Sequence, residues 1–441
     1  MTPQNDGAFW EPEYECMELP ELRELQLQRL QTTAARAYEN VPFYRRHFDE
    51  AGINPGDLKS LDDLRRVPFT VKDDFRQNYP YDLLAVDRSE VVRVHASSGT
   101  TGKATVVSYT QKDLEMWSDM VARILVMAGV NEDSVVQVAF GYGLFTGGFG
   151  LHYGIERAGA TVVPASSGNT KRHIQLIQDL GTTHIVCTPS YAVYLCETAR
   201  ELSVDLVADT NLTTGCFGGE PWSEGMRVQL EAEYGLKAFD NYGLSELIGP
   251  GVSGECAARG GLHIFEDHFY AEIIDPDTGE VLPEGEMGEL VITNLTRRAQ
   301  PVLRYRTRDI TRLHREPCDC GRTHVRMERV TGRTDDMLII RGVNLFPTQI
   351  EHAFLEAEGT SPNYQIVVDR DGALDTIEVK IEVNEAMLSD EMKNLSRLQD
   401  DIARRLGDAI GLRPRITLVE PGTLPRSQGK AVRVVDNRTK D

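Results

Sequence analysis

Basic residues are scarce relative to acidic ones in this sequence. Lys and Arg together number 47 among 441 residues, against 68 Asp and Glu, so the formal net charge is −21. Binding of nucleic acid depends largely on Lys and Arg contacts to phosphates, and this balance therefore excludes nucleic acid as the main partner. A bound polyphosphate would need a local pocket of backbone N–H groups and a few basic side chains.

Cysteine is also sparse, and its count of seven is odd. An odd, low count fits a reducing compartment better than a disulfide framework. The first residues show neither the basic region nor the apolar core of a signal peptide. The one uncharged run long enough to span a membrane, residues 134–155, has glycines throughout its second half in place of dense leucine. We therefore expect a cytoplasmic protein with no membrane partner, and we consider a homodimer.

Strand and helix patterns alternate along the first half of the chain. Residues 20–65 predict a helical N-terminal cap, and Thr110 with Asp113 predicts a capping box for a helix that ends at Gly129. Strands and helices then alternate over residues 135–140, 152–158, 160–164, 170–180, 184–187, 191–202, 212–217 and 223–234. Residues 141–150 are expected to form a glycine-rich loop. The alternation implies an α/β fold whose parallel sheet is covered by helices.

The pattern changes after Gly260 to short strands with hairpin signals. We expect a tight turn at 275–279, strands at 289–293 and 302–306, and an antiparallel subdomain built from them. A small α+β unit follows, with strands at 337–341, 365–368, 377–383 and 415–419 and a helix at 390–406. We therefore predict a large N-terminal domain of parallel and mixed sheets, residues 1–334, and a small C-terminal domain, residues 335–441.

Residues 97–103, Ser-Ser-Gly-Thr-Thr-Gly-Lys, combine hydroxyls, two glycines and a lysine between two predicted strands. Such a loop can surround a polyphosphate, although it is not a Walker A loop, which a helix follows directly. A polar hairpin tip is the alternative. Ligands of parallel sheets bind beyond the carboxyl ends of the strands, where residues 141–150, 218–222 and 241–246 also lie. We therefore expect one site built from these stretches.

Five motifs occur in a characteristic order: residues 97–103, Asn-Tyr-Gly-Leu-Ser-Glu at 241–246, Tyr-Arg-Thr-Arg-Asp at 305–309, 332–336, and Pro-Arg-Ser-Gln-Gly-Lys at 425–430. Together they resemble the adenylate-forming superfamily of acyl-CoA synthetases and adenylation domains. Residues 142–148, 262–269 and 341–347 narrow the resemblance to the phenylacetate–CoA ligase branch. The resemblance implies ligation of phenylacetate, or a close aryl acid, to CoA through an acyl-adenylate, with ATP cleaved to AMP and pyrophosphate.

Two alternatives stay open at this point. One is adenylation without CoA, as in an enzyme of this branch that adenylates a deazaflavin hydroxyl. The other is a nucleotide-binding sensor without enzymatic activity.

The resemblance also implies roles for individual residues. Lys430, Glu246 and Thr100 would be catalytic, Glu246 would bind Mg²⁺, and Asp335 would be the hinge of a mobile C-terminal domain. The nucleotide would be bound by Ser97, Ser98, Gly99, Thr101, Gly102, Lys103, Gly219, Glu220, Pro221, Asn241, Tyr242, Gly243, Ser245, Asp309 and Arg333. Arg308 stands where the superfamily usually has glycine.

The acyl pocket is expected to be formed by Tyr142, Phe145, Gly147 and Pro250, because aromatic side chains and glycines suit a flat ring. The alternative is that Tyr142 and Phe145 pack the core.

Four further residues predict a second, structural site. Cys256 and His263 flank a glycine turn, and Cys318 and Cys320 share a polar loop, so they can form a tetrahedral zinc site. His324 is a rival fourth ligand, and free surface thiols are the alternative to a metal. The other cysteines, Cys16, Cys187, Cys196 and Cys216, have the setting of ordinary buried or strand residues.

Overall fold

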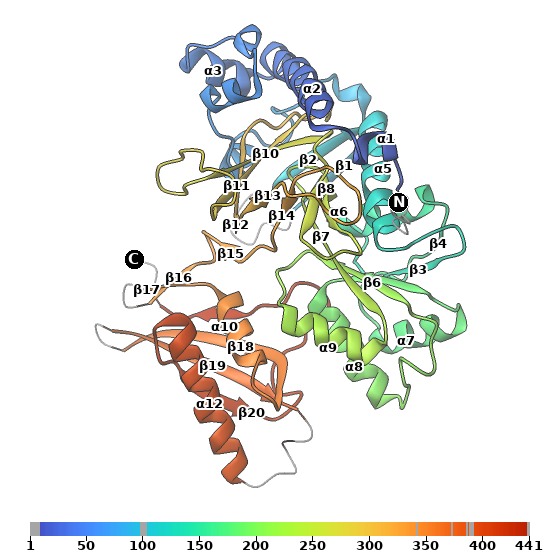
Figure 1. Cartoon of the computed structure of the whole chain (residues 1–441), viewed down its shortest axis with the longest axis vertical. Coiled ribbons are helices and arrows are strands. Elements are labelled where there is room, and N and C mark those ends of the chain that lie inside the picture. The colour runs from blue at the N-terminus through green and yellow to red at the C-terminus, as the bar shows by residue number, and fades with distance from the viewer. Residues whose placement is uncertain are drawn as a thin grey trace.

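The computed structural model describes residues 9–97, 104–340, 343–371, 374–384, 387 and 392–438. We refer to residues 9–334 as the N-terminal unit and to residues 338–438 as the C-terminal unit, which has a hydrophobic core of its own. Figure 1 shows the C-terminal unit in orange and red below the N-terminal unit. Among the described residues, no helix is both long enough and apolar enough to cross a bilayer.

The N-terminal unit is built on a nine-stranded sheet in the order β13-β14-β9-β8-β7-β6-β5-β3-β4. Its parallel half consists of β3 (Val135–Val138), β4 (Thr161–Val163), β5 (His184–Cys187), β6 (Thr214–Gly218) and β7 (Lys237–Leu244). The helices that connect these strands are α6 (Thr146–Arg157), α7 (Thr170–Asp179), α8 (Pro189–Glu201) and α9 (Glu224–Tyr234). The predicted α/β alternation is confirmed.

The antiparallel half of this sheet consists of β8 (Gly249–Glu255), β9 (Leu262–Ile264), β13 (Leu313–His314) and β14 (Arg326–Met327). The change of direction therefore comes at β8 and not after Gly260 as expected. The connection from β7 to β8 has only four residues, 245–248, whereas a parallel crossover needs about a dozen. Connection length thus determines where the parallel half ends.

A four-stranded antiparallel sheet forms the predicted subdomain from β10 (Phe269–Ile274), β11 (Gly288–Asn294), β12 (Tyr305–Thr311) and β15 (Gly332–Arg333). The expected strand at 302–306 is wrong in its bounds, because β12 begins only at Tyr305. Arg304 has a φ of +47°, a left-handed conformation that interrupts an extended strand. The motif at 305–309 therefore lies within a strand.

The remaining N-terminal elements cover these sheets. The predicted capping box is confirmed, since the Thr110 hydroxyl accepts from the Asp113 N–H while Asp113 accepts from the Thr110 N–H at 2.8 Å. The helices are α1 (Pro12–Glu15), α2 (Leu19–Asn40), α3 (Pro42–Glu50), α4 (Lys72–Gln77) and α5 (Gln111–Met127), with short 3₁₀ turns at Pro55–Asp57, Leu61–Arg66 and Arg88–Glu90. The two strands predicted around the loop are β1 (Val91–Ala96) and β2 (Val106–Thr110), and they pair antiparallel.

The C-terminal unit has the predicted α+β composition. Its strands are β16 (Leu338–Ile340), β17 (Val343–Leu345), β18 (Thr360–Asp371), β19 (Leu374–Val383), β20 (Arg415–Val419) and β21 (Val434–Asp436), and its helices are α10 (Pro347–Leu355) and α12 (Met392–Ile410). The strands β20-β19-β18-β21 form one sheet, against which α10 and α12 pack. Figure 1 shows α10 and β18 on the side of this unit that faces α8 and α9.

Two glycines of this region, Gly150 and Gly154, are explained by helix packing, and the second half of the expected loop at 141–150 is helical. Helix α6 begins at Thr146, six residues before the predicted start, and packs on α5. A Cβ atom on Gly150 would lie 2.4 Å from Cζ2 of Trp117, and one on Gly154 would lie 2.3 Å from Cγ1 of Val121. Glycine at these positions lets the two helices approach closely.

We predict that Gly154→Ala destabilises the protein. Alanine at an open helical position normally gains about 1 kcal/mol over glycine, but overpacking a tight contact costs about 1–3 kcal/mol, so the sign should reverse here. Gly407→Ala in α12 is the matched control, because its Cβ would meet nothing nearer than 3.6 Å. Calorimetry should show a lower melting temperature for Gly154→Ala and an unchanged or higher one for Gly407→Ala. Equal stabilisation by both changes would contradict the packing argument.

Candidate active site

A cleft of about 1410 Å³ lies between the two units, at the carboxyl ends of the parallel strands. Residues just beyond β3, β5 and β6 line it, among them Gly141, Thr188 and Gly219. Lys430 of the C-terminal unit lines the same cleft. The cleft thus joins the end of a parallel sheet, where ligands of such sheets bind, to a cation from a second unit.

The structure brings most of the predicted site residues together. Those that line the cleft are Ser97, Phe145, Gly147, Gly219, Asn241, Gly243, Ser245, Glu246, Pro250, Arg333, Asp335 and Lys430. Glu220, Pro221, Tyr142, Tyr242 and Asp309 are not among the lining residues. Tyr142 packs edge-on against Phe149, and its hydroxyl lies 3.2 Å from Nδ1 of His152. Ser98, Gly99, Thr100, Thr101, Gly102 and Lys103 lie outside the described residues.

Asp309 is a buried carboxylate held from two sides. The Tyr242 hydroxyl donates to its Oδ2 at 2.7 Å, and Nη1 of Arg333 donates to its Oδ1 at 3.0 Å. Burial raises the pKa of Asp309, and the Arg333 guanidinium opposes this shift. Each carboxylate oxygen has a second lone pair, so Asp309 can still accept hydroxyl groups of a ligand.

Glu246 and Ser245 lie in the short connection between β7 and β8. The Glu246 side chain is largely buried, and Nζ of Lys72 lies 3.8 Å from its Oε1. Nη1 of Arg297 donates to the Glu246 carbonyl at 2.7 Å, which fixes the backbone there. The Ser245 and Thr146 hydroxyls lie 3.0 Å apart. The cleft therefore holds one carboxylate and two hydroxyls close together.

Lys430 reaches the cleft from the loop before β21. Its side chain is exposed to solvent in the cleft, and nearby protein atoms remove part of the solvation of its ammonium group. This loss of solvation, followed by the positive charge of Arg333, lowers the pKa of Lys430, and Glu220, Asp309 and Glu246 oppose the shift. The lysine is thus placed where it can approach an anionic ligand that also contacts Ser245.

Several cleft residues were not predicted from the sequence. Lys72 and Thr146 are examples, and no motif marks Lys72. Thr146 lies at the first position of α6, which was hidden because residues 141–150 were interpreted as a loop. Arg308 also lines the cleft, with a φ of +70°, a conformation that glycine adopts without strain. This backbone geometry would suit the glycine that the resemblance leads us to expect at this position.

The four residues predicted for a metal site are clustered. One ligand atom from each of Cys256, His263, Cys318 and Cys320 lies within 4.8 Å of every other. The Sγ atoms of Cys256 and Cys318 are 3.6 Å apart, and Sγ of Cys320 is 3.4 Å from Nε2 of His263. His324 is not part of this cluster, and it contributes its carbonyl oxygen, 3.3 Å from Nδ1 of His263.

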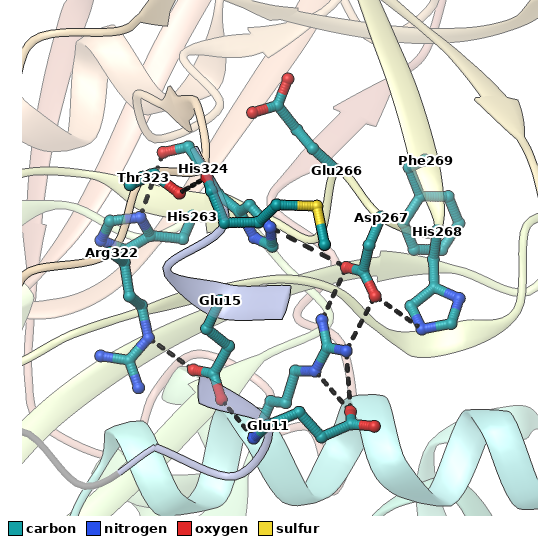
Figure 2. A network of polar contacts seen from close by, with 12 residues as sticks. Glu11, Glu15, His263, Glu266, Asp267, His268, Phe269, Arg322, Thr323 and His324 are labelled. Atoms are coloured by element: carbon teal, nitrogen blue, oxygen red, sulfur yellow. Dashed lines mark hydrogen bonds and ion pairs between the residues drawn. The ribbon is translucent and has the colours of Figure 1, made fainter. Parts of the chain in front are cut away.

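A network of polar contacts lies beside His263 of this cluster, as Figure 2 shows. Nε of Arg322 donates to Glu15 at 2.7 Å, and the Thr323 N–H donates to the carbonyl oxygen of Glu15 at 3.1 Å. Arg123 donates to both oxygens of Asp267, at 2.7 and 2.8 Å. The loop that carries Cys318 and Cys320 is therefore fixed to the segment around α1.

The fold and the cleft are those expected of an adenylate-forming enzyme. A parallel sheet, an acidic residue beyond β7 and a lysine from a separate α+β unit meet at one cleft. The AMP-binding enzyme family model matches residues 44–296, and the AMP-binding enzyme C-terminal domain model matches residues 342–438. The chain belongs to the AMP-binding enzyme family. The predicted superfamily and fold are confirmed.

Two curated relatives carry the same name. The chain is 51% identical to phenylacetate-coenzyme A ligase of Thermus thermophilus, with 98% of this chain and 100% of the relative covered. It is 49% identical to phenylacetate-coenzyme A ligase of Escherichia coli, with 96% and 97% covered.

A solved structure of 2-hydroxyisobutyryl-CoA ligase in the postadenylation state, with 2-HIB-AMP, is 31% identical to this chain. It has a TM-score of 0.93, with 99% of this chain and 94% of that chain covered. The same enzyme in the thioesterification state, with CoA as well, gives a TM-score of only 0.72 at 32% identity, with 97% and 92% covered. The two units of this chain are therefore arranged as in the postadenylation state.

Proposed function

We propose that the chain joins phenylacetate, or a close aryl acid, to CoA through an acyl-adenylate, with ATP cleaved to AMP and pyrophosphate. The observation that carries the proposal is the position of Lys430 in the same cleft as Ser245, Glu246 and Arg333. The two relatives named phenylacetate-coenzyme A ligase support the choice of acid and of thiol.

The first step is the attack of a carboxylate on the α-phosphate of ATP. Both reactants are anions, so catalysis must come mainly from positioning and from neutralisation of charge. Lys430 supplies the positive charge, the Ser245 hydroxyl contacts the α-phosphate, and Asp309 accepts from the ribose hydroxyls. The loop at residues 97–103, with Thr100, would hold the β- and γ-phosphates, and Gly219 with Asn241 would border the adenine.

Glu246 fits a magnesium ion bound with ATP. It is largely buried and faces the cleft, and one carboxylate combined with substrate phosphates is the arrangement that Mg²⁺ favours. The ion would supply charge neutralisation at the phosphates.

The acid would bind beside Phe145, Gly147 and Pro250, which line one region of the cleft. A Cβ on Gly147 would lie 2.8 Å from the Phe145 ring, so glycine leaves this ring face open to a flat substrate. Tyr142 lies outside the cleft wall and would act through its contacts with Phe149 and His152.

In the second step the CoA thiol attacks the acyl carbon and AMP leaves. The C-terminal unit would first rotate about Asp335, which removes Lys430 from the cleft. The two states solved for 2-hydroxyisobutyryl-CoA ligase support such an exchange, because this chain matches one of them much better than the other.

We also propose a structural zinc ion at Cys256, His263, Cys318 and Cys320. Tetrahedral zinc, with Zn–S near 2.3 Å and Zn–N near 2.0 Å, requires an S···S separation of about 3.8 Å and an S···N separation of about 3.5 Å. The distances of 3.6 and 3.4 Å agree with these values. Nδ1 of His263 faces a carbonyl oxygen, which leaves Nε2 as the metal ligand.

A homodimer and a cytoplasmic location stay predictions.

The function is tested by pyrophosphate release from ATP with a panel of aryl acids, with and without CoA. We expect phenylacetate to give the fastest release and CoA to raise turnover by forming a thioester. Transfer of AMP without any thioester would favour an enzyme that does not use CoA. Absence of pyrophosphate release with every aryl acid would refute the proposal.

We predict that Lys430→Ala slows formation of the acyl-adenylate at least about 100-fold, because a preorganised charge is lost at the reacting phosphate. Transfer of a supplied acyl-adenylate to CoA should be spared. Val432→Ala, at a neighbouring and 75% exposed side chain, is the control and should leave both steps unchanged. Isotope exchange between pyrophosphate and ATP measures the first step. An equal loss in both steps for Lys430→Ala would speak against the rotation of the C-terminal unit.

We predict about one zinc ion per chain in freshly purified protein. His263→Ala should lose the metal, whereas His324→Ala should keep it, because His324 offers only its backbone oxygen to this cluster. Elemental analysis of the wild type and both variants makes the comparison. Less than half an equivalent of zinc in the wild type, or equal metal loss in both variants, would reject the assignment.

A further inference from the structure

The segment that carries Lys430 is attached to the N-terminal unit on both sides of the lysine. Before it, Arg426 donates to Glu197 of α8 through Nε at 2.6 Å and Nη2 at 2.8 Å. After it, the Ala431 N–H donates to Oε2 of Glu220 at 2.8 Å. Two carboxylates of the N-terminal unit therefore hold a segment of six residues that belongs to the other unit.

Glu197 receives its hydrogen bonds from the C-terminal unit. Besides Arg426, Nδ2 of Asn363 in β18 donates to its Oε1 at 2.8 Å. The side chain is 26% exposed, so the ion pair is partly shielded from solvent. Hydrogen bonds to a charged partner contribute more than neutral ones, and partial exposure to solvent weakens them. Glu197 thus stabilises the arrangement of the two units in which Lys430 lies in the cleft.

Glu220 connects the Lys430 segment to the start of α8. Its Oε1 accepts from the Ser190 N–H at 2.7 Å, in its own unit, while its Oε2 accepts from Ala431. The Thr188 hydroxyl, which caps α8, donates to the Gly429 carbonyl at 3.2 Å. These contacts flank Lys430 directly and so determine where its side chain enters the cleft.

The attachment can break without leaving a buried charge unpaired on the moving side. Arg426 also donates to the buried Glu382 of its own unit, through Nη1 at 2.8 Å and Nη2 at 2.7 Å. If the C-terminal unit moves away, Arg426 keeps this partner. Glu197 then loses its hydrogen bonds from Arg426 and Asn363, and Glu220 loses the one from Ala431 but keeps the one from Ser190. Glu197 is near the surface and can then be solvated, so separation is reversible.

We propose that Glu197 and Glu220 are positioning residues that hold Lys430 in the cleft for adenylation and must release it before the thioester step. They act through the backbone and through Arg426, without contact to the reacting atoms. This inference rests on the proposed two-step function. A pair of carboxylates that do not line the cleft would thus set the equilibrium between the arrangement with Lys430 in the cleft and the arrangement with Lys430 withdrawn.

The test compares the two half-reactions in Glu197→Gln and Glu220→Gln. We expect each variant to slow the phenylacetate-dependent exchange of pyrophosphate into ATP by about tenfold. Loss of one charged hydrogen bond should lower the population with Lys430 in the cleft by about this factor. Transfer of supplied phenylacetyl-adenylate to CoA should stay unchanged or become faster. The control is Glu233→Gln, which removes a charge that pairs with Arg200 within the N-terminal unit and should change neither step.

A second measurement does not depend on activity. Proteolysis near Asp335 should become faster in Glu197→Gln than in Glu233→Gln, because the C-terminal unit separates more often. Glu197→Asp should recover part of the exchange rate, since it keeps the charge. Equal slowing of both half-reactions by Glu197→Gln, or no change in either, would overturn the inference. A wild type that shows no exchange with any aryl acid would instead refute the proposed function.

Discussion

Two anions must meet in a protein that is itself strongly acidic. The net charge of −21 repels both a carboxylate substrate and ATP, so positive charge has to be concentrated where they react. Among the described residues that line the cleft, six are basic and five acidic, which makes this surface nearly balanced in contrast to the chain as a whole. Lys430 differs from the other five basic residues because it comes from the C-terminal unit. The placement of that unit therefore determines how much positive charge the cleft contains.

Much of the fold could be predicted from the sequence because its elements follow local rules. The capping box at Thr110 and Asp113 and the alternation of strands and helices depend on residues close together in the chain. Gly150 and Gly154 of α6 could not be interpreted in the same way. Their reason is the closeness of Trp117 and Val121 in α5, which only the tertiary structure shows. The start of β12 was missed for a similar reason, since Arg304 adopts a left-handed conformation that its residue type does not indicate.

The site was predictable to the extent that motifs carry it. Ser245, Glu246 and Asp309 lie at or beside the cleft as their motifs indicated. The choice between His263 and His324 could not be made from spacing, because both lie near the cysteines and only the ring orientation of His263 distinguishes them. Glu220 shows a different limit of prediction from sequence motifs. Its motif places it beside the adenine, whereas its carboxylate contacts the backbone of Ala431, a residue 211 positions later in the chain.

The contact between the two units is suited to repeated separation. The hydrophobic cores of the units are distinct, and Leu355 is the side chain that packs at the edge of both the α8–α9 core and the C-terminal core. Other connections between the described parts of the two units are polar, as in the pairs of Glu197 with Arg426 and of Ser223 with Glu351, while the Phe346 ring lies against Gly332. Polar groups at such an interface exchange their partners for water at modest cost, whereas a shared apolar core would have to be exposed. In the proposed two-step function Lys430 enters and leaves the cleft in each turnover, and a polar interface suits such movement. This proposal would explain why carboxylates and not apolar side chains hold its segment.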